Sequence, residues 1–151
     1  MVEAFFYCIF VSENRSTIII SDMIQQDYIL RLVAEFFEAL RLLSKRKKDV
    51  SDKLDALDKL YNDYLGDSQF CHVAEMDEVM ESFKRWPEQE RIHRMEMLAE
   101  LYYVEANLKE GLPRQLLQER ALLLFSFIDA HSDTFSFERL QKISELEKHV
   151  G

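Results

Sequence analysis

Apolar residues recur at steps of three and four along most of this 151-residue chain, the spacing that puts side chains on one face of an α-helix. The few glycines and prolines interrupt the periodic stretches at Gly66, Pro87, Gly111 and Pro113. Both residue types commonly mark helix ends. The pattern predicts an all-α protein of six antiparallel amphipathic helices, placed at about 22–44, 52–65, 73–86, 88–108, 113–130 and from Ser136 to the end.

Two of the predicted helices have unusually wide apolar faces. In the first, Leu30 and Leu42 widen a face that already contains Ile29 and Phe36. The fifth is almost continuously apolar from Ala121 to Ile128. A face this wide needs more than one neighbour to cover it, so we expect both helices to be central in the fold.

The first 22 residues do not follow the helical spacing of apolar residues that the rest of the chain shows. Ala4–Val11 and Thr17–Ile20 are short aromatic and β-branched runs, which are typical of strands or unstructured segments. We expect residues 1–22 to be an extension upstream of a native start at Met23, with 23–151 forming a single helical domain. The alternative is that three aromatic side chains of this segment pack on the helices: Phe5, Phe6 and Phe10.

Composition narrows the functional class. The formal charge is −9, from 28 acidic and 19 basic residues, and such a surface repels the nucleic-acid backbone. Cys8 and Cys71 are too few for a disulfide framework, and Cys71 beside His72 is not a specific signature of a nucleophile and its base. The apolar run near the N-terminus is too short for a membrane span and lacks the features of a secretion signal. We therefore expect a cytoplasmic protein that binds neither nucleic acid nor membrane.

One spacing offers candidate metal ligands. Glu90, His93 and Glu96 follow one another at three-residue steps, as in the Glu-x-x-His helices of di-iron bundles. Such a site needs a second helix of the same kind, and the sequence has none. Arg91 and Arg94 lie beside the three residues, which favours an ion-paired, solvated face. A metal- or small-ligand-binding bundle is thus the alternative function, and we expect no catalytic residue and no cofactor.

A second group of residues suits a protein-binding surface. Aromatic and polar side chains enriched in interfaces lie away from the main apolar stripes or on the N-terminal flank of the fold. We predict that these residues contact a protein partner or a second copy of the chain: Tyr28, Leu32, Trp86, Tyr103, Asn107 and Arg114. The alternative is that the aromatic members bury against the adjacent helices.

Three stretches, 23–32, 93–103 and 134–143, resemble an uncharacterised bacterial family of small tetratricopeptide-like (TPR-like) proteins. Residues that match the repeat are Leu98, Tyr102, Ala121 and Phe125. The chain departs from the repeat where a turn glycine is missing and Glu105 and Ala106 stand. The resemblance implies helix pairs stacked in an α-α superhelix, a bacterial cytoplasm and no assigned reaction. With the composition, it predicts a non-enzymatic protein that mediates protein–protein interaction or self-association.

Overall fold

The computed structural model describes the backbone of residues 2–150 and the side chains of residues 20–150. Over this range the protein is helical and contains no strand, which confirms the all-α prediction. It has seven α-helices instead of six, together with one 3-10 turn. The elements are α1 (Val2–Lys45), α2 (Val50–Leu65), α3 (Ser68–Val73), α4 (Met76–Ser82), η1 (Phe83–Arg85), α5 (Glu88–Leu108), α6 (Gly111–His131) and α7 (Phe137–Val150).

The boundaries of the later helices follow the predicted punctuation. α5 has the predicted bounds, and α6 begins two residues before the predicted 113 and ends one after the predicted 130. The hydroxyl of Ser136 accepts a hydrogen bond from the Arg139 amide at 3.2 Å, so Ser136 caps the start of α7. Ser51 does not cap α2, because that helix already begins at Val50, after Asp49.

The predicted helix over 73–86 is wrong, because two short helices and the 3-10 turn η1 occupy residues 68–85. Each short helix has its own start signal. The side chain of Asp67 accepts from the Phe70 amide at 3.3 Å and caps α3. Glu75 and Glu78 form a reciprocal capping box at the start of α4. These caps satisfy N–H groups at the start of each short helix. Two helices therefore begin, at Ser68 and at Met76, in place of the single helix expected over 73–86.

The strand-like or unstructured reading of residues 1–22 is also wrong. Their backbone from Val2 onward is helical and continues without a break to Lys45. The expectation that Phe5, Phe6 and Phe10 pack on the other helices concerns side chains outside the described residues. A native start at Met23 stays a prediction.

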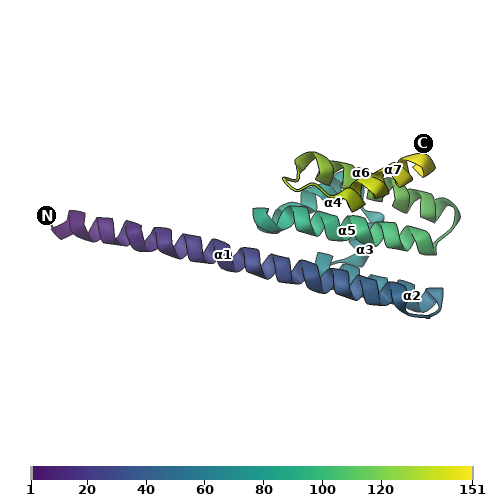
Figure 1. Cartoon of the computed structure of the whole chain (residues 1–151), viewed down its shortest axis with the longest axis horizontal. Helices are drawn as coiled ribbons and strands as arrows, with labels where there is room; N and C mark the ends of the chain where they lie inside the picture. The colour runs from purple at the N-terminus through teal and green to yellow at the C-terminus, as the bar shows by residue number, and fades with distance from the viewer. Residues whose placement is uncertain (1, 151) are drawn as a thin grey trace.

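α5 is the central helix of the protein, and it packs against α1, α2 and α6 (Figure 1). Its residues are buried at every consecutive position from Met97 to Tyr102, so neighbours cover it on all sides. α6 contacts both α5 and α7, as its apolar sequence predicts. The central position predicted for the first helix is wrong. α1 lies at the edge of the packed helices, and Leu30 and Leu42 on its outer side are exposed.

The N-terminal part of α1 projects beyond the other helices (Figure 1). The inward-facing stripe of α1 is buried at Ile29, Phe36, Leu40 and Leu43. Continued toward the N-terminus at the same spacing, this stripe reaches Asp22, Gln25 and Gln26, which are polar and exposed. The helix therefore loses its apolar contact face where it leaves the packed helices. We call residues 2–28 the arm, and residues 29–150 the body.

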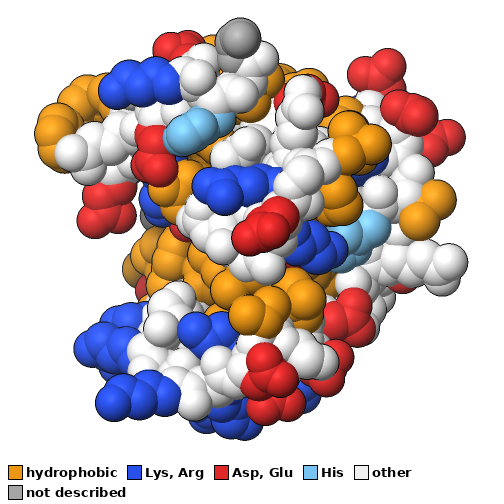
Figure 2. Space-filling view, turned by 90° about the vertical axis from the view of Figure 1, so that its right-hand side faces the viewer, with side chains coloured by type: hydrophobic (Ala, Val, Ile, Leu, Met, Phe, Trp, Pro, Cys, Tyr) orange, Lys and Arg blue, Asp and Glu red, His pale blue; other side chains and the backbone are white. Residues whose placement is uncertain are grey.

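The surface of the body is unevenly charged. Lys and Arg side chains gather at the end of the molecule where α1 turns into α2 (Figure 2), and residues 45–48 of this turn are all basic and exposed. Across the described part of the chain, no helix combines the length and the apolarity that crossing a membrane requires.

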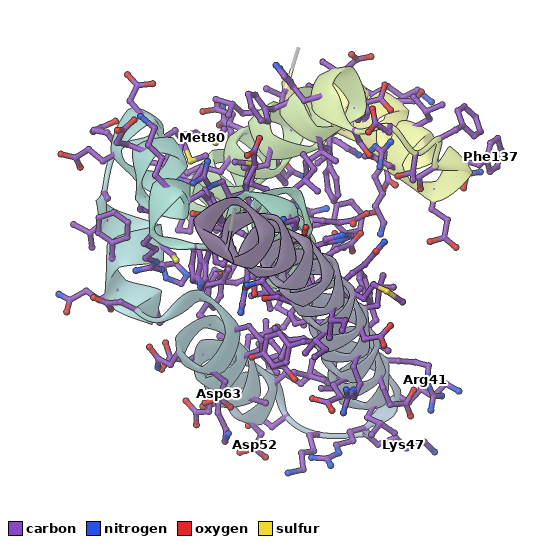
Figure 3. The ribbon with its side chains drawn as sticks, turned by 90° about the vertical axis from the view of Figure 1, so that its left-hand side faces the viewer. Arg41, Lys47, Asp52, Asp63, Met80 and Phe137 are labelled. Carbon is purple, nitrogen blue, oxygen red and sulfur yellow. The ribbon has the colours of Figure 1, made fainter. Side chains whose placement is uncertain are left out.

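Replacing Phe36 by Ala should lower the free energy of unfolding by about 3–5 kcal/mol, because it removes a large side chain from a closed site. Phe36 is 0% exposed and its ring meets Phe37 and Tyr64 at 5.2 Å. The matched control is Phe137→Ala, since Phe137 points away from the body (Figure 3) and is 65% exposed. Urea melts should show a loss within about 0.5 kcal/mol for this control. A similar small loss for Phe36→Ala would contradict the packing of α1.

Candidate functional site

The six residues predicted to form an interaction surface do not lie together. Tyr28 is exposed on the arm, whereas Leu32 packs partly on the core of the body. Trp86 precedes α5, Tyr103 and Asn107 lie in the C-terminal part of α5, and Arg114 lies in the first turn of α6. The structure therefore brings together Tyr28 with Leu32 on α1 and Tyr103 with Asn107 on α5, each pair one turn apart on its own helix, and does not gather the six residues into one surface.

Trp86 is half-buried and makes contacts within the chain. Its ring lies against the guanidinium groups of Arg85 and Arg94, whose central carbons are 4.0 and 5.1 Å from the ring centre. Arg94 also donates to the Tyr64 carbonyl at 2.6 Å, and Arg85 donates to the Leu65 carbonyl. These cations thus satisfy carbonyls at the C-terminal end of α2, where a helix dipole favours positive charge. The position of Trp86 is explained by this packing.

Tyr103 is likewise tied to a neighbouring helix. Its hydroxyl donates to Glu145 of α7 at 2.8 Å, and burial, with the hydrogen bond and charge of Glu145, raises the pKa of Tyr103 to about 12. Lys142 of α7 lies 5.3 Å from the ring centre and donates to both carboxylate oxygens of the buried Glu100, at 2.5 and 2.7 Å. Burial raises the pKa of Glu100, and Lys142 opposes that shift. These contacts dock α7 onto α5.

The candidate metal ligands are not arranged as a site. Glu90 is buried and pairs with Arg94 at 3.2 Å, while His93 and Glu96 are half-buried on the same helix. Among residues 20–150, no group of three or more His, Cys, Asp or Glu side chains lies close enough to hold a metal ion. The observed partner of Glu90 is thus an arginine within the chain.

The arm carries an apolar ridge that the body does not cover. Ile20, Ile24 and Tyr28 follow one another at four-residue steps, with Met23 beside them, and each is at least 50% exposed. The ridge lies on the side of the helix opposite the stripe that begins at Ile29. Because the body contacts α1 only along that stripe, folding back onto its own helices cannot cover the ridge.

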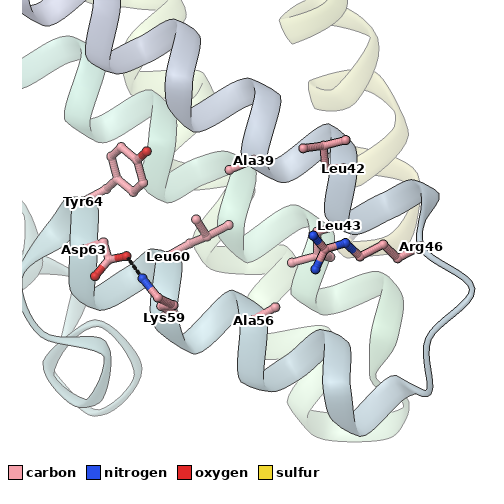
Figure 4. A pocket seen from close by; sticks show the side chains of 9 residues that line it. All are labelled: Ala39, Leu42, Leu43, Arg46, Ala56, Lys59, Leu60, Asp63 and Tyr64. Carbon is pink, nitrogen blue, oxygen red and sulfur yellow. Dashed lines mark hydrogen bonds and ion pairs between the residues drawn. The ribbon is translucent and has the colours of Figure 1, made fainter.

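A shallow groove of about 320 Å³ runs between α1 and α2 (Figure 4). Leu42, Leu43 and Leu60 contribute apolar surface, and Lys59 pairs with Asp63 at its edge. The groove is open to solvent, and besides the Lys59–Asp63 pair it is lined by the basic side chain of Arg46. No contact in the structure indicates what would occupy it.

The most ordered polar arrangement in the body is a charge cluster around Glu105 of α5. Its buried carboxylate accepts hydrogen bonds from Tyr61 at 2.7 Å, from His72 at 2.8 Å and from Lys109 at 2.7 Å. Burial alone would raise the pKa of Glu105, but these donors lower it to about 2. Glu105 is therefore a buried anion at neutral pH, held by Tyr61 of α2, His72 of α3 and Lys109 at the C-terminal end of α5. We call these four residues the charge cluster.

His72 is held in its cationic form by its hydrogen-bond partners. Its Nε2 faces the Glu105 carboxylate, and its Nδ1 faces the Ser68 carbonyl at 2.7 Å. Both partners can only accept, so both ring nitrogens must carry a proton. The hydrogen bond to Glu105 is the main reason why the pKa of His72 is raised, although burial opposes the shift.

Arg120 of α6 donates hydrogen bonds to carbonyl groups at the C-terminal end of α3. It donates to the carbonyls of Cys71 at 3.0 Å and Ala74 at 2.7 Å, and the hydroxyl of Tyr102 donates to the same Cys71 carbonyl at 2.5 Å. Cys71 itself is buried, and burial raises the pKa of its thiol to about 11. A thiol in this environment stays protonated at neutral pH, and His72 has no free nitrogen to act as its base.

Sequence reasoning missed the charge cluster, although one signal was present. Glu105 stands on the inward stripe of α5, seven residues after Leu98 and three after Tyr102, with Lys109 one turn later. A charged residue on an apolar stripe indicates a buried, paired group. The contributions of Tyr61, 44 residues away, and His72, 33 residues away, have no such local signal.

Comparison with protein-family models, with curated proteins and with solved structures finds no match to this chain. The resemblance to small TPR-like bacterial proteins therefore stays a prediction. Function must be argued from the geometry of the chain itself.

Replacing Glu105 by Gln should lower the free energy of unfolding by on the order of 3 kcal/mol near neutral pH, because the shape is kept and the charge is lost. The stability contributed by Glu105 is present above its ordinary pKa of 4.5 and is lost as the pH falls toward 2. The stability contributed by His72 is complete below its ordinary pKa of 6.5 and is lost as the pH rises through the raised pKa that His72 has in the folded protein.

The difference in unfolding free energy between the wild type and Glu105→Gln should thus be largest between the ordinary pKa of Glu105, 4.5, and that of His72, 6.5. It should be smaller at lower and at higher pH. Urea melts at acidic, intermediate and alkaline pH measure it. The exposed Glu110 gives a control, since Glu110→Gln should change stability by no more than about 0.5 kcal/mol. A difference that is independent of pH would contradict the assigned protonation states.

Proposed function

We propose that this protein is a non-enzymatic helical interaction module that associates with a second copy through the arm. The single observation that supports this function is the exposed ridge of Ile20, Ile24 and Tyr28 on a helix that extends beyond the body. Contiguous apolar surface on a protein is commonly an interface. The ridge faces away from the body, so only another molecule can cover it.

The ridge is self-complementary when two arms run antiparallel. If Ile24 of one copy meets Ile24 of the other, then Ile20 of each lies beside Tyr28 of its neighbour, and small side chains oppose large ones. In the same register Asp22 faces Gln26, and Asp27 faces Ser21. Within residues 20–28 this register brings no like charges opposite one another, even though the chain as a whole is strongly acidic.

The position of the body also favours pairing of the arms. The body contacts α1 along the stripe opposite the ridge, so it does not obstruct an approaching helix. Two antiparallel arms would place the two bodies at opposite ends of the pair (Figure 1). This is a symmetric contact in which the same patch is used by both copies.

We also propose that the body is a TPR-like helical array, and the packing of its last three helices supports this. α1 and α2 both pack on α5, whereas α5 packs on α6, and α6 packs on α7, so the last three helices are neighbours in chain order. Helical repeat arrays are built in this way and use their exposed faces and ends for binding. The body would then fix the direction in which the arm extends, because α1 packs on it from Ile29 onward.

Replacing Ile24 by Glu should convert a dimer into a monomer, because it puts a charge at the centre of the paired ridges. Light scattering or sedimentation of the full chain over a micromolar range measures the mass. The matched control is Gln25→Glu, which adds the same charge to the neighbouring position on the polar side of the arm. Ile24 is a better test than Leu32, because Leu32 packs on the core and its substitution would also disturb folding.

Self-association through the arm is wrong if the full chain is monomeric over that range, or if Gln25→Glu dissociates it as completely as Ile24→Glu. Circular dichroism of each variant checks that the body keeps its helix content. A dimer that survives Ile24→Glu would place the interface elsewhere and contradict pairing through the ridge.

A further inference from the structure

The charge cluster borders a pocket of about 200 Å³ between α3, the C-terminal end of α5 and the first half of α6. This place in the fold is remote in sequence from the arm and plays no part in its proposed pairing. We call it the basic pocket, and its lining residues are His72, Lys109, Pro113, Leu116, Leu117 and Arg120.

One side of the basic pocket is cationic. His72 carries two ring protons because both of its partners are acceptors, and Lys109 and Arg120 are basic side chains. Glu105 is the single carboxylate paired with this group, and it pairs with His72 and Lys109. Three positive groups against one negative group leave an excess of two positive charges. The first turn of α6, which contains Pro113, adds the positive end of a helix dipole.

The positive excess contrasts with the net negative charge of the chain, and Arg120 does not use its charge in an ion pair within residues 20–150. The protein has a formal charge of −9, yet Arg120 has no carboxylate partner among residues 20–150 and is held by the carbonyls of Cys71 and Ala74. Carbonyl contacts orient a guanidinium group without cancelling its charge. Arg120 therefore keeps a full positive charge in a fixed position beside the pocket.

The other side of the basic pocket is apolar. Pro113, Leu116 and Leu117 of α6 form it, and Leu116 is 49% exposed. A pocket with an apolar wall and a few fixed polar groups is the usual form of a small-molecule site. Its volume lies below the 300–1,000 Å³ that is typical for drug-sized ligands, which favours a small ligand, and the positive charge disfavours a metal cation.

We propose that the basic pocket binds a carboxylate carried on a short apolar group. The carboxylate would lie against Lys109, Arg120 and the imidazolium of His72, and the apolar group would lie against Leu116 and Leu117. Such a ligand can be a free organic acid or the C-terminal carboxylate of a peptide with an apolar last residue, because both carry the same charge and the same kind of side group.

The test is a titration of isotope-labelled full-length protein followed by NMR. Benzoate should shift the signals of His72 and Leu117 to a saturating value. Benzyl alcohol, which has the apolar ring without the charge, and inorganic phosphate, which has charge without an apolar group, should not. A short peptide ending in leucine, compared with its amidated form, separates the two sources of carboxylate. Tighter binding of the free peptide than of benzoate indicates a chain end, and weaker binding indicates a free acid.

Two variants on α6 make the titration specific for the basic pocket. Leu116→Glu puts a negative charge into its apolar wall and should weaken benzoate binding by about tenfold or more. Leu123→Glu makes the same change at an exposed leucine two turns further along α6, outside the pocket, and should change the affinity by less than about twofold. The proposal is overturned if neither benzoate nor the free peptide saturates, if benzyl alcohol acts as benzoate does, or if Leu116→Glu binds benzoate normally.

Discussion

The burial of α5 on every side is the constraint on which the rest of this structure depends. Its glutamates at 90, 100 and 105 lie in the interior, and a buried carboxylate without a partner costs several kcal/mol. Each therefore has a cation: Arg94 on the same helix, Lys142 from α7, and His72 with Lys109 at the third. Because two of these partners come from other helices, the charge pairs determine how α3 and α7 dock on α5.

Basic side chains also satisfy carbonyl groups at the C-terminal ends of α2 and of the short helix α3. Arg85 and Arg94 donate to carbonyls at the end of α2, and Arg120 donates to carbonyls at the end of α3. Helices of six or seven residues have most of their carbonyls at an end, so the region between α2 and α5 relies on such donors. Arg120 shows the consequence for function: a cation held by carbonyls is fixed in place and still attracts an anion.

Sequence pattern predicted the long helices well and the short or remote features poorly. The first and last residues of α5 could be predicted because Pro87 and Gly111 stand on either side of a strongly periodic apolar pattern. α3 and α4 are too short to show a period, and only their caps at Asp67 and Glu75 indicated where they begin. Of the charge cluster, Glu105 and Lys109 were accessible from their spacing on α5. The other members depend on tertiary contacts, which a single sequence does not encode locally.

The error over the N-terminal segment has a physical lesson for the arm. The aromatic and β-branched runs at Ala4–Val11 and Thr17–Ile20 favoured a strand-like or unstructured segment, yet the backbone there is helical. Along this helix the stripe that packs on the body turns polar at Asp22, Gln25 and Gln26. The apolar residues had moved to the opposite side of the same helix, at Ile20 and Ile24. An isolated helical segment gains little stability from propensity alone, so covering this ridge would stabilise residues 20–28 as well as join two chains. A helix whose apolar face changes sides is thus built to contact two different surfaces, and the body supplies only one of them.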